Sequence, residues 1–156
     1  MFISRKLAVR DSAKGKALVA LEEIPMGEVL IRFDGTFLPR PTKNTLQIDV
    51  GKHLEGPGEI DDYLNHSCSP NGYIEFDTLS YKTMRMVSPG EELTFNYLTT
   101  EWDMANKFRC VCGSAACLHE IKGFRYLTLA QKQALKRFLS PYLIKKLAEE
   151  ERSTQD

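Results

Sequence analysis

No apolar stretch among the 156 residues approaches the roughly 18 that a membrane-spanning helix requires. Neither sign of charge is in excess, because 21 basic residues balance 21 acidic ones. This balance excludes attachment to nucleic acid or to an anionic membrane through bulk charge. Arg5 and Lys6 stand where a secretory signal would carry its apolar region. We therefore expect a soluble intracellular protein of one compact domain, cytoplasmic or nuclear, with no membrane contact and no direct nucleic-acid binding.

Cysteine is scarce, with four residues in the whole chain, and without a secretory signal these predict reduced thiols or a metal site. Three of them form the motif Cys110-x-Cys112-x4-Cys117. Cysteines this close rarely satisfy disulfide geometry, whereas three thiolates can converge on one Zn²⁺, which then needs a fourth ligand. The candidates for that ligand are Cys68, His53, His66 and His119. The alternative is four free, partly buried thiols, since cysteine is often buried.

Short apolar runs separated by turn residues predict a β-rich body over the first two thirds of the chain. The expected strands include 17–20, 29–33, 46–50 and 82–87. The last third changes to helical spacing. Thr128 and Gln131 form a capping box for a first helix, and Ser140-Pro141 ends that helix and begins a second.

Two polar segments of the body contain residue types suited to a ligand site. Asn65-His66-Ser67-Cys68-Ser69-Pro70-Asn71 concentrates side chains that both donate and accept hydrogen bonds. Gly90-Glu91-Glu92-Leu93-Thr94-Phe95-Asn96-Tyr97 is a turn that leads into an amphipathic strand. Taken alone, the first segment is equally a loop that caps its own backbone, and the second a plain edge strand with two core aromatic residues.

Taken together, these two segments and the Cys-x-Cys-x4-Cys motif resemble the SET domain of protein lysine methyltransferases with its post-SET zinc segment. The order of the three motifs and their spacing agree with that family. Upstream, Gly15-Lys16-Ala17-Leu18-Val19-Ala20 and Ile24-Pro25-Met26-Gly27-Glu28 resemble the family's cofactor loop and first hairpin. The resemblance covers roughly residues 3 to 127.

The resemblance implies a β-rich α+β fold. In that fold several small β-sheets with a C-terminal pseudoknot are followed by a zinc-bound post-SET loop and, in this chain, by two C-terminal helices. The expected parts are a SET domain at 1–100, a post-SET zinc segment at 106–122 and a C-terminal helical extension at 123–156. In the pseudoknot a C-terminal segment threads beneath a loop, so that the histidine and tyrosine segments meet.

The resemblance also implies S-adenosylmethionine as methyl donor, S-adenosylhomocysteine as its product, and one structural zinc. The residues that match the cofactor site are Lys14, Gly15, Lys16, Ala17, Asn65, His66 and Tyr97, with Phe108 and Leu118 flanking the adenine. The residues that match the zinc ligands are Cys68, Cys110, Cys112 and Cys117. Lys14 to Ala17 would act through their backbone.

Methyl transfer to a lysine needs a neutral amine, although a free lysine has a pKa of about 10.4. An apolar channel that ends near a positive sulfonium would favour the neutral form. Tyr97 matches the family's catalytic tyrosine, which would hold the amine and the sulfur in line rather than act as a strong base. Phe95 matches the position in the substrate channel that is linked to the number of methyl groups added, and phenylalanine there favours di- and trimethylation.

The expected partner is a protein or peptide with a target lysine, and the expected state is a monomer or a weak homodimer. Four acidic residues within 55–62 would attract a basic peptide, as would Glu101 and Asp103, although such runs are more often solvated loops.

The chain departs from the family pattern at several positions. Ala17 stands where a second glycine is usual, which requires a negative φ there, and Asn96 stands where an acidic residue is usual. The segment 44–61 lacks the aromatic residue that lines the lysine channel of many histone-directed members. A catalytically weak SET-fold binding module and a zinc scaffold are therefore the alternative functions.

Overall fold

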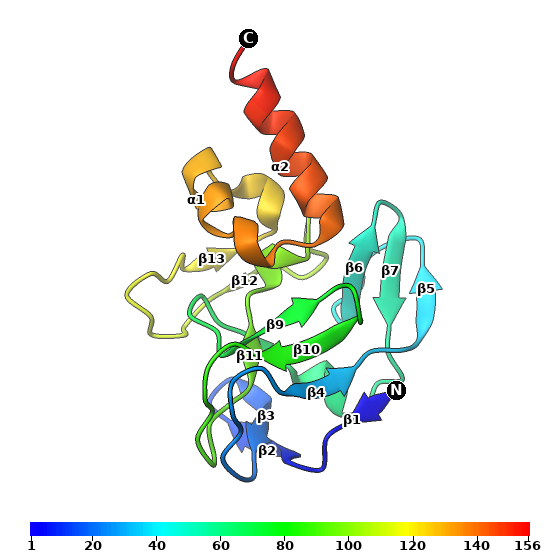
Figure 1. The fold of residues 1–156 in the computed structure, drawn as a ribbon, viewed down its shortest axis with the longest axis vertical. Helices are drawn as coiled ribbons and strands as arrows, with labels where there is room; N and C mark the ends of the chain where they lie inside the picture. The colour runs from blue at the N-terminus through cyan, green and yellow to red at the C-terminus, as the bar shows by residue number, and fades with distance from the viewer.

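Five small sheets, none with more than four strands, lie within the chain up to residue 121 in the computed structural model, which describes residues 1–156 (Figure 1). One sheet is the hairpin of β2 (Leu7–Ser12) and β3 (Gly15–Ala20). Gly15 begins β3 with φ +98°, a conformation that suits glycine. Ala17 is not among the residues with positive φ, so the alanine fits the backbone that this loop adopts.

The central sheet has four strands in the order β1-β4-β10-β9. Its strands are β1 (Phe2–Ile3), β4 (Val29–Arg32), β10 (Ser80–Thr83) and β9 (Gly72–Glu75), and all its pairs are antiparallel. A second antiparallel sheet, in the order β5-β7-β6, stands to one side of it (Figure 1). Its strands are β5 (Thr36–Leu38), β7 (Lys52–Glu55) and β6 (Thr45–Asp49).

Two strand pairs of two residues each join distant parts of the chain. β8 (Asn65–His66) pairs in parallel with β11 (Thr94–Phe95), so the two polar segments of the sequence meet as the SET resemblance implies. β12 (Phe108–Arg109) pairs with β13 (Glu120–Ile121) and encloses the cysteine-bearing loop. Short 3₁₀ turns of three or four residues separate these pairs from their neighbours. They are η1 (Ile60–Tyr63), η2 (Tyr97–Thr99) and η3 (Phe124–Tyr126).

The main core lies between the hairpin, the central sheet and the β8–β11 pair. Twelve buried apolar residues form it, and Tyr81 is the largest of its fully buried side chains. The Tyr81 hydroxyl donates to Asn71 Oδ1 at 2.9 Å and to the carbonyl of Thr94 at 3.0 Å. A Cβ on Gly72 would lie 2.2 Å from the Tyr81 ring, so only glycine permits this close approach. The polar core of the fold thus joins the loop after β8 to β11.

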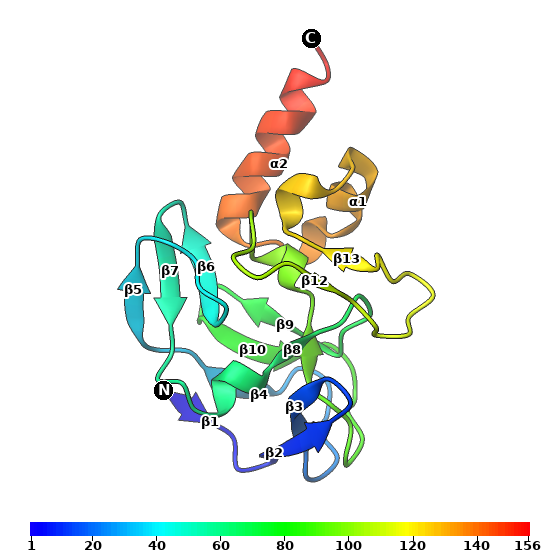
Figure 2. The ribbon, with the colours of Figure 1, turned by 180° about the vertical axis from the view of Figure 1, so that it is seen from behind.

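The C-terminal helices follow the capping pattern of the sequence. α1 (Leu129–Ala134) begins with the predicted capping box, in which Thr128 Oγ1 accepts from Gln131 N and Gln131 Oε1 accepts from Thr128 N. A short 3₁₀ turn, η4 (Lys136–Phe138), follows, and α2 (Pro141–Ser153) begins after the Ser140 cap. α2 rises away from the sheets, and its end lies farthest from the β2–β3 hairpin (Figure 2).

Two expectations about local structure are corrected. The strand expected at 82–87 ends at Thr83, and of its last residues Val87 alone pairs, as an isolated bridge with Ile24. The tyrosine segment is a strand over Thr94–Phe95 alone, because the chain turns into η2 at Tyr97. No helix is long and apolar enough to span a bilayer.

Candidate functional site

A cleft of about 770 Å³ lies where the β2–β3 turn, the β8–β11 pair, η1 and the segment before the cysteine loop come together. The predicted site residues that line it are Lys14, Gly15, Lys16, Asn65, His66, Phe95, Tyr97 and Phe108. Ala17 and Leu118 lie outside its lining. Ala17 is fully buried in the hairpin, and Leu118 packs in the small apolar cluster around Leu98. Their proposed roles in cofactor binding remain predictions.

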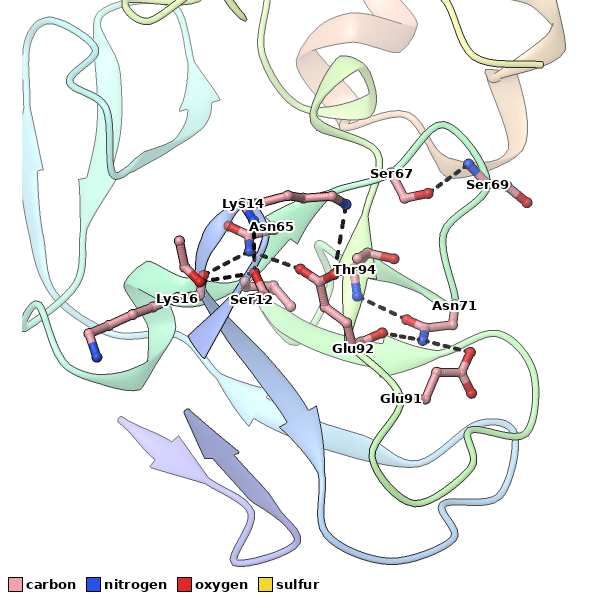
Figure 3. A network of polar contacts seen from close by, with 12 residues as sticks. Ser12, Lys14, Lys16, Asn65, Ser67, Ser69, Asn71, Glu91, Glu92 and Thr94 are labelled. Carbon is pink, nitrogen blue, oxygen red and sulfur yellow. Dashed lines mark hydrogen bonds and ion pairs between the residues drawn. The ribbon is translucent and has the colours of Figure 1, made fainter. Parts of the chain in front are cut away.

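Asn65 connects the hairpin turn to Glu92, near the start of the Gly90–Tyr97 segment (Figure 3). Its side-chain amide donates to the carbonyl of Lys16 at 3.0 Å and to Glu92 Oε1 at 2.8 Å. The other Glu92 oxygen lies 3.7 Å from Lys14 Nζ. Glu92 was not predicted as a site residue, because its role depends on two partners far away in the chain. Both of its oxygens help hold the turn that the resemblance assigns to the cofactor.

Asn71 makes a second set of contacts that closes the same region (Figure 3). Its Oδ1 accepts from Thr94 N at 2.9 Å, and its Nδ2 donates to the carbonyl of Glu92 at 2.8 Å. With the Tyr81 hydroxyl, these bonds satisfy most of the hydrogen-bonding capacity of a buried amide. The loop that carries the cysteine Cys68 is therefore anchored at both of its ends.

His66 is buried between the cleft and the cysteines. Its Nδ1 accepts from the backbone N–H of Tyr97 at 3.1 Å, which assigns the ring proton to Nε2. Nε2 lies 3.4 Å from Cys68 Sγ, so a Cys68 thiolate would accept that proton's hydrogen bond. Burial, with a smaller effect of Lys14, lowers the pKa of His66 to about 4. A neutral imidazole therefore connects the two parts of the site.

Tyr97 stands in the middle of the aromatic residues of the cleft. Its hydroxyl donates to the carbonyl of Leu64 at 2.8 Å, and its ring centroid lies 4.8 Å from that of Phe95 and 5.3 Å from that of His66. Burial, with smaller effects of Glu101 and Glu92, raises the pKa of Tyr97 well above its usual range. The hydroxyl is therefore protonated at neutral pH, and the Leu64 carbonyl fixes its direction.

The four cysteines gather at one point beside the cleft. Their Sγ atoms all lie within 4.8 Å of one another, and Cys68 Sγ is 4.0 Å from Cys110 Sγ. Four sulfurs around a tetrahedral Zn²⁺ with bonds of about 2.3 Å would be separated by about 3.8 Å. Burial, and then the neighbouring thiols, raise the pKa of the Cys68 thiol to about 12, so Cys68 needs a cation beside it to be a thiolate.

The geometry also separates Cys68 from the other candidates for the fourth metal ligand. The group of possible ligands contains the four cysteines and no histidine. His53 lies on β7 with its Nδ1 buried and unpaired, and His119 is exposed. The donor set that fits Zn²⁺ is thus four thiolates, the composition of a structural zinc site.

The two acidic residues beyond Tyr97 lie in different surroundings. Asp103 pairs with Lys107 and Arg125 at the surface, at 3.0 Å and 3.2 Å. Glu101, in contrast, is 8% exposed and lines the cleft. Burial raises the pKa of Glu101 to about 7, although hydrogen bonds from Gln47 N and Thr100 Oγ1 oppose the shift. Sequence reasoning had no signal that this side chain turns inward.

Residues 15–98, more than half of the chain, match the family model described as SET domain. Among curated proteins, Methyltransferase flvH of Aspergillus flavus is 39% identical over 124 residues, which cover 76% of this chain and 66% of the relative. Histone-lysine N-methyltransferase EHMT1 of Mus musculus is 32% identical over 149 residues, covering 80% of this chain and 11% of the relative. The chain thus spans about two thirds of the fungal relative and a small part of the mouse relative.

Solved structures show the same fold. KRYPTONITE in complex with mCHG DNA and SAH superposes with a TM-score of 0.62 at 23% identity, covering 77% of this chain and 30% of that one. The methyltransferase domain of human histone-lysine N-methyltransferase SETMAR superposes with a TM-score of 0.60 at 21% identity, covering 78% and 59%. We predicted a fold of small sheets, a cysteine loop and two C-terminal helices. The structure of this chain and its likeness to these proteins confirm that prediction.

Proposed function

This chain belongs to the SET domain family, and from that premise we propose that it is an S-adenosylmethionine-dependent protein lysine N-methyltransferase with one structural zinc. One observation carries the proposal. The Asn65–His66 segment, Phe95 and Tyr97 line one cleft, and the Tyr97 hydroxyl is fixed there by the Leu64 carbonyl. A donor bound on one side of Tyr97 and a lysine on the other would meet at that hydroxyl.

On this proposal the residues of the β2–β3 turn and β8 bind the donor. The backbone of Lys14 to Lys16 and the Asn65 side chain border one side of the cleft, and the exposed ring of Phe108 borders it from the zinc segment. When bound, S-adenosylmethionine supplies a methyl group activated by its sulfonium, so the protein needs no catalytic metal. The four thiolates would hold Zn²⁺ as a structural ion that keeps Phe108 in place.

Tyr97 and its neighbours would orient the reaction. The hydroxyl, held by the Leu64 carbonyl at 2.8 Å, would keep the lysine nitrogen and the methyl group in line. The rings of Phe95 and Tyr97 would exclude water from the lysine end. Nearby carbonyl oxygens would support the polarised methyl through weak C–H···O contacts.

The proposed substrate is a protein or peptide lysine. The support comes from the relatives named as histone-lysine methyltransferases and from the KRYPTONITE structure that contains an H3(1-15) peptide. We propose an intracellular protein, cytoplasmic or nuclear, acting as a monomer or a weak homodimer.

The test combines a labelled donor with a matched pair of variants. The zinc-loaded protein is incubated with S-adenosylmethionine carrying a labelled methyl group and a mixed proteome, and labelled lysines are identified by mass spectrometry. Tyr97→Phe should lower kcat/KM by about 10²-fold while donor affinity stays within about twofold, as expected for a contact felt in the transition state. Tyr142→Phe, in α2 and outside the cleft, is the control. Donor binding without turnover by wild type would favour a binding module.

A further inference from the structure

Glu101 is an acidic residue of the cleft lining that the backbone places next to Tyr97. Its N–H donates to the carbonyl of Tyr97 at 3.0 Å, so it follows Tyr97 by one helical turn, and its charge raises the pKa of the Tyr97 phenol. The side chain is buried yet lines the cleft. A carboxylate in this position is costly unless it has a partner.

The two oxygens of the Glu101 carboxylate differ. Oε1 accepts from the backbone N–H of Gln47 at 2.8 Å and from Thr100 Oγ1 at 3.0 Å. Oε2 takes part in no hydrogen bond or ion pair within the protein. Of the side-chain nitrogen and oxygen atoms that have no hydrogen-bond partner, only His53 Nδ1 is fully enclosed. Oε2 therefore keeps accessible surface, and the space beside this buried side chain is the cleft.

No cation of the protein neutralises this carboxylate. The elements packed against Glu101 are β6, through the uncharged Gln47, η2, through Tyr97, and η3, through the N–H of Phe124. Arg125, the cation of η3, pairs with Asp103 instead. The other ionisable groups of the cleft belong to the β2–β3 turn, the loop before β6, η1, β8 and the β12 segment. They are Lys14, Lys16, Lys43, Asp61, Asp62, Tyr63, His66, Arg109 and Cys110. None of them pairs with Glu101, so the free oxygen is available to a positive group that enters the cleft.

We propose that Glu101 Oε2 binds the ε-ammonium of the target lysine and accepts its proton before methyl transfer, an assignment that rests on the proposed function. The lysine R–NH₃⁺ and the carboxylate become R–NH₂ and a carboxylic acid. The amine then forms a bond to the methyl carbon as the carbon–sulfur bond of the sulfonium breaks, giving R–NH₂⁺–CH₃ and a neutral thioether. Glu101 afterwards releases its proton to water at the open end of the cleft.

Two further properties suit Glu101 to this role. Burial brings the pKa of Glu101 to about 7, so the group takes and releases a proton near neutral pH. Its Oε1 is held by two donors, which leaves Oε2 in a fixed direction. A purely structural role, joining β6 to the turn after η2, would use Oε1 alone. Glu101→Gln keeps a carbonyl oxygen for those two donors and removes the charge, so it separates the two roles.

The binding test needs no turnover. Zinc-loaded protein saturated with S-adenosylhomocysteine is titrated by NMR with N-acetyl-lysine N-methylamide and with its uncharged norleucine analogue. At pH 8 wild type should favour the lysine probe by about tenfold, as for a charge-assisted hydrogen bond. This preference should decline as the pH falls below about 7. In Glu101→Gln it should fall to about one at every pH.

Asp62→Asn, which removes another carboxylate of the cleft lining, is the matched control and should change the preference by less than about twofold. An unchanged preference in Glu101→Gln overturns the proposal. An equal loss in Asp62→Asn also overturns it, because the attraction would then be a general effect of negative charge. Failure of wild type to bind the lysine probe overturns it as well.

The pH dependence of turnover gives a second readout, with any protein labelled in the proteome assay as substrate. In wild type kcat should rise with pH around a midpoint of about 7, and in Glu101→Gln that midpoint should move up by about two units, toward the pKa of lysine. A lower rate with the same midpoint would assign Glu101 a structural role. If wild type labels no protein, the proposed function fails, whereas the binding test still decides on Glu101.

Discussion

Phe95 and Tyr97 lie two residues apart, with ring centroids 4.8 Å from each other. Tyr97 has a hydroxyl and Phe95 has none, and their proposed roles differ for that reason. Phe95→Tyr would add a hydroxyl at a side chain that is 8% exposed and borders the cleft. That hydroxyl can hydrogen-bond the target amine or hold a water where a methylated nitrogen must turn. We expect activity to persist while the products shift to monomethyl-lysine, measured by mass spectrometry of the substrate.

The control for this change is Phe37→Tyr, which adds the same oxygen to an exposed ring on β5. It should leave the proportions of mono-, di- and trimethyl-lysine unchanged. If Phe95→Tyr makes the same products as wild type, Phe95 does not border the turning nitrogen and its assignment to the substrate channel is wrong.

Glu101 also predicts a pH dependence of stability that is independent of catalysis. Its pKa is raised by burial from an unfolded value of 4.5 to about 7. Between these values the native state binds more protons than the unfolded state, so stability falls as the pH rises through this window. Glu101→Gln removes that loss. Relative to wild type, the variant should gain on the order of 2–3 kcal/mol between about pH 4 and pH 8.

Urea denaturation at the two pH values measures this gain, since the linear extrapolation yields a free energy of unfolding at each pH. Glu23→Gln, at an exposed glutamate, is the control and should show the same difference from wild type at both pH values. If the free energy of unfolding of Glu101→Gln also differs from that of wild type by the same amount at both pH values, the Glu101 carboxyl of wild type titrates normally in the folded protein.

At this scale the sequence predicted residues with a strong motif and missed those defined by distant contacts. Asn65, His66 and Tyr97 could be named because their spacing resembles that of a known family. Glu92 could not, and Glu101 was named only among the acidic residues that would attract a basic peptide. The position of each depends on a partner far along the chain, Asn65 for Glu92 and Gln47 for Glu101. The sequence indicated that Ala17 requires a negative φ, but only the structure shows that Ala17 is not among the residues with positive φ.

The zinc segment has little regular structure to hold it together. β12 and β13 pair over two residues each, and a loop with the three clustered cysteines lies between them. Cys112→Ser should therefore reduce bound zinc from about one per chain to a small fraction and expose the backbone amides of 106–122 to exchange. The central sheet should keep its protection, because its core does not include this segment.

Hydrogen-exchange mass spectrometry and metal analysis measure both effects. Val111→Ala, at a residue 69% exposed between two of the cysteines, is the control and should retain its zinc. Full zinc content in Cys112→Ser, or two disulfides in the wild-type protein, would remove the four-thiolate site.

Elements were predictable where their signals are local. The Thr128 capping box and the Ser140-Pro141 start are short-range chemistry, and both helices begin where these residues predict. Strand ends were less predictable, as at 82–87, because a strand lasts only as long as a neighbour accepts its hydrogen bonds. β10 ends at Thr83, where its pairing with β9 also ends.

The architecture of the whole molecule depends on the parallel pairing of β8 with β11, two strands of two residues each. No periodicity in the sequence indicates that His66 and Phe95 are neighbours, because the pairing is long-range and short. The family resemblance predicted it. The bonds of Asn71 to Thr94 and Glu92 provide its physical basis, since they satisfy polar groups that would otherwise be buried without partners.

This architecture links the cysteine site to the cleft. His66 contacts Tyr97 N through Nδ1 and Cys68 Sγ through Nε2, while Phe108 and Cys110 line the cleft from the zinc segment. Zinc and the donor should therefore stabilise each other's sites. We expect S-adenosylhomocysteine to bind the zinc-loaded protein about 10- to 100-fold more tightly than the stripped protein.

Linkage requires the reverse effect to have the same size, so saturating S-adenosylhomocysteine should raise zinc affinity by the same factor. Calorimetry of loaded and stripped protein measures the first factor, and competition with a chelator, with and without S-adenosylhomocysteine, measures the second. His66→Ala, which removes the shared contact but no thiolate, should reduce both factors together. If the stripped protein binds S-adenosylhomocysteine as tightly as the loaded one, the two sites are independent, and the zinc segment does not order the cleft.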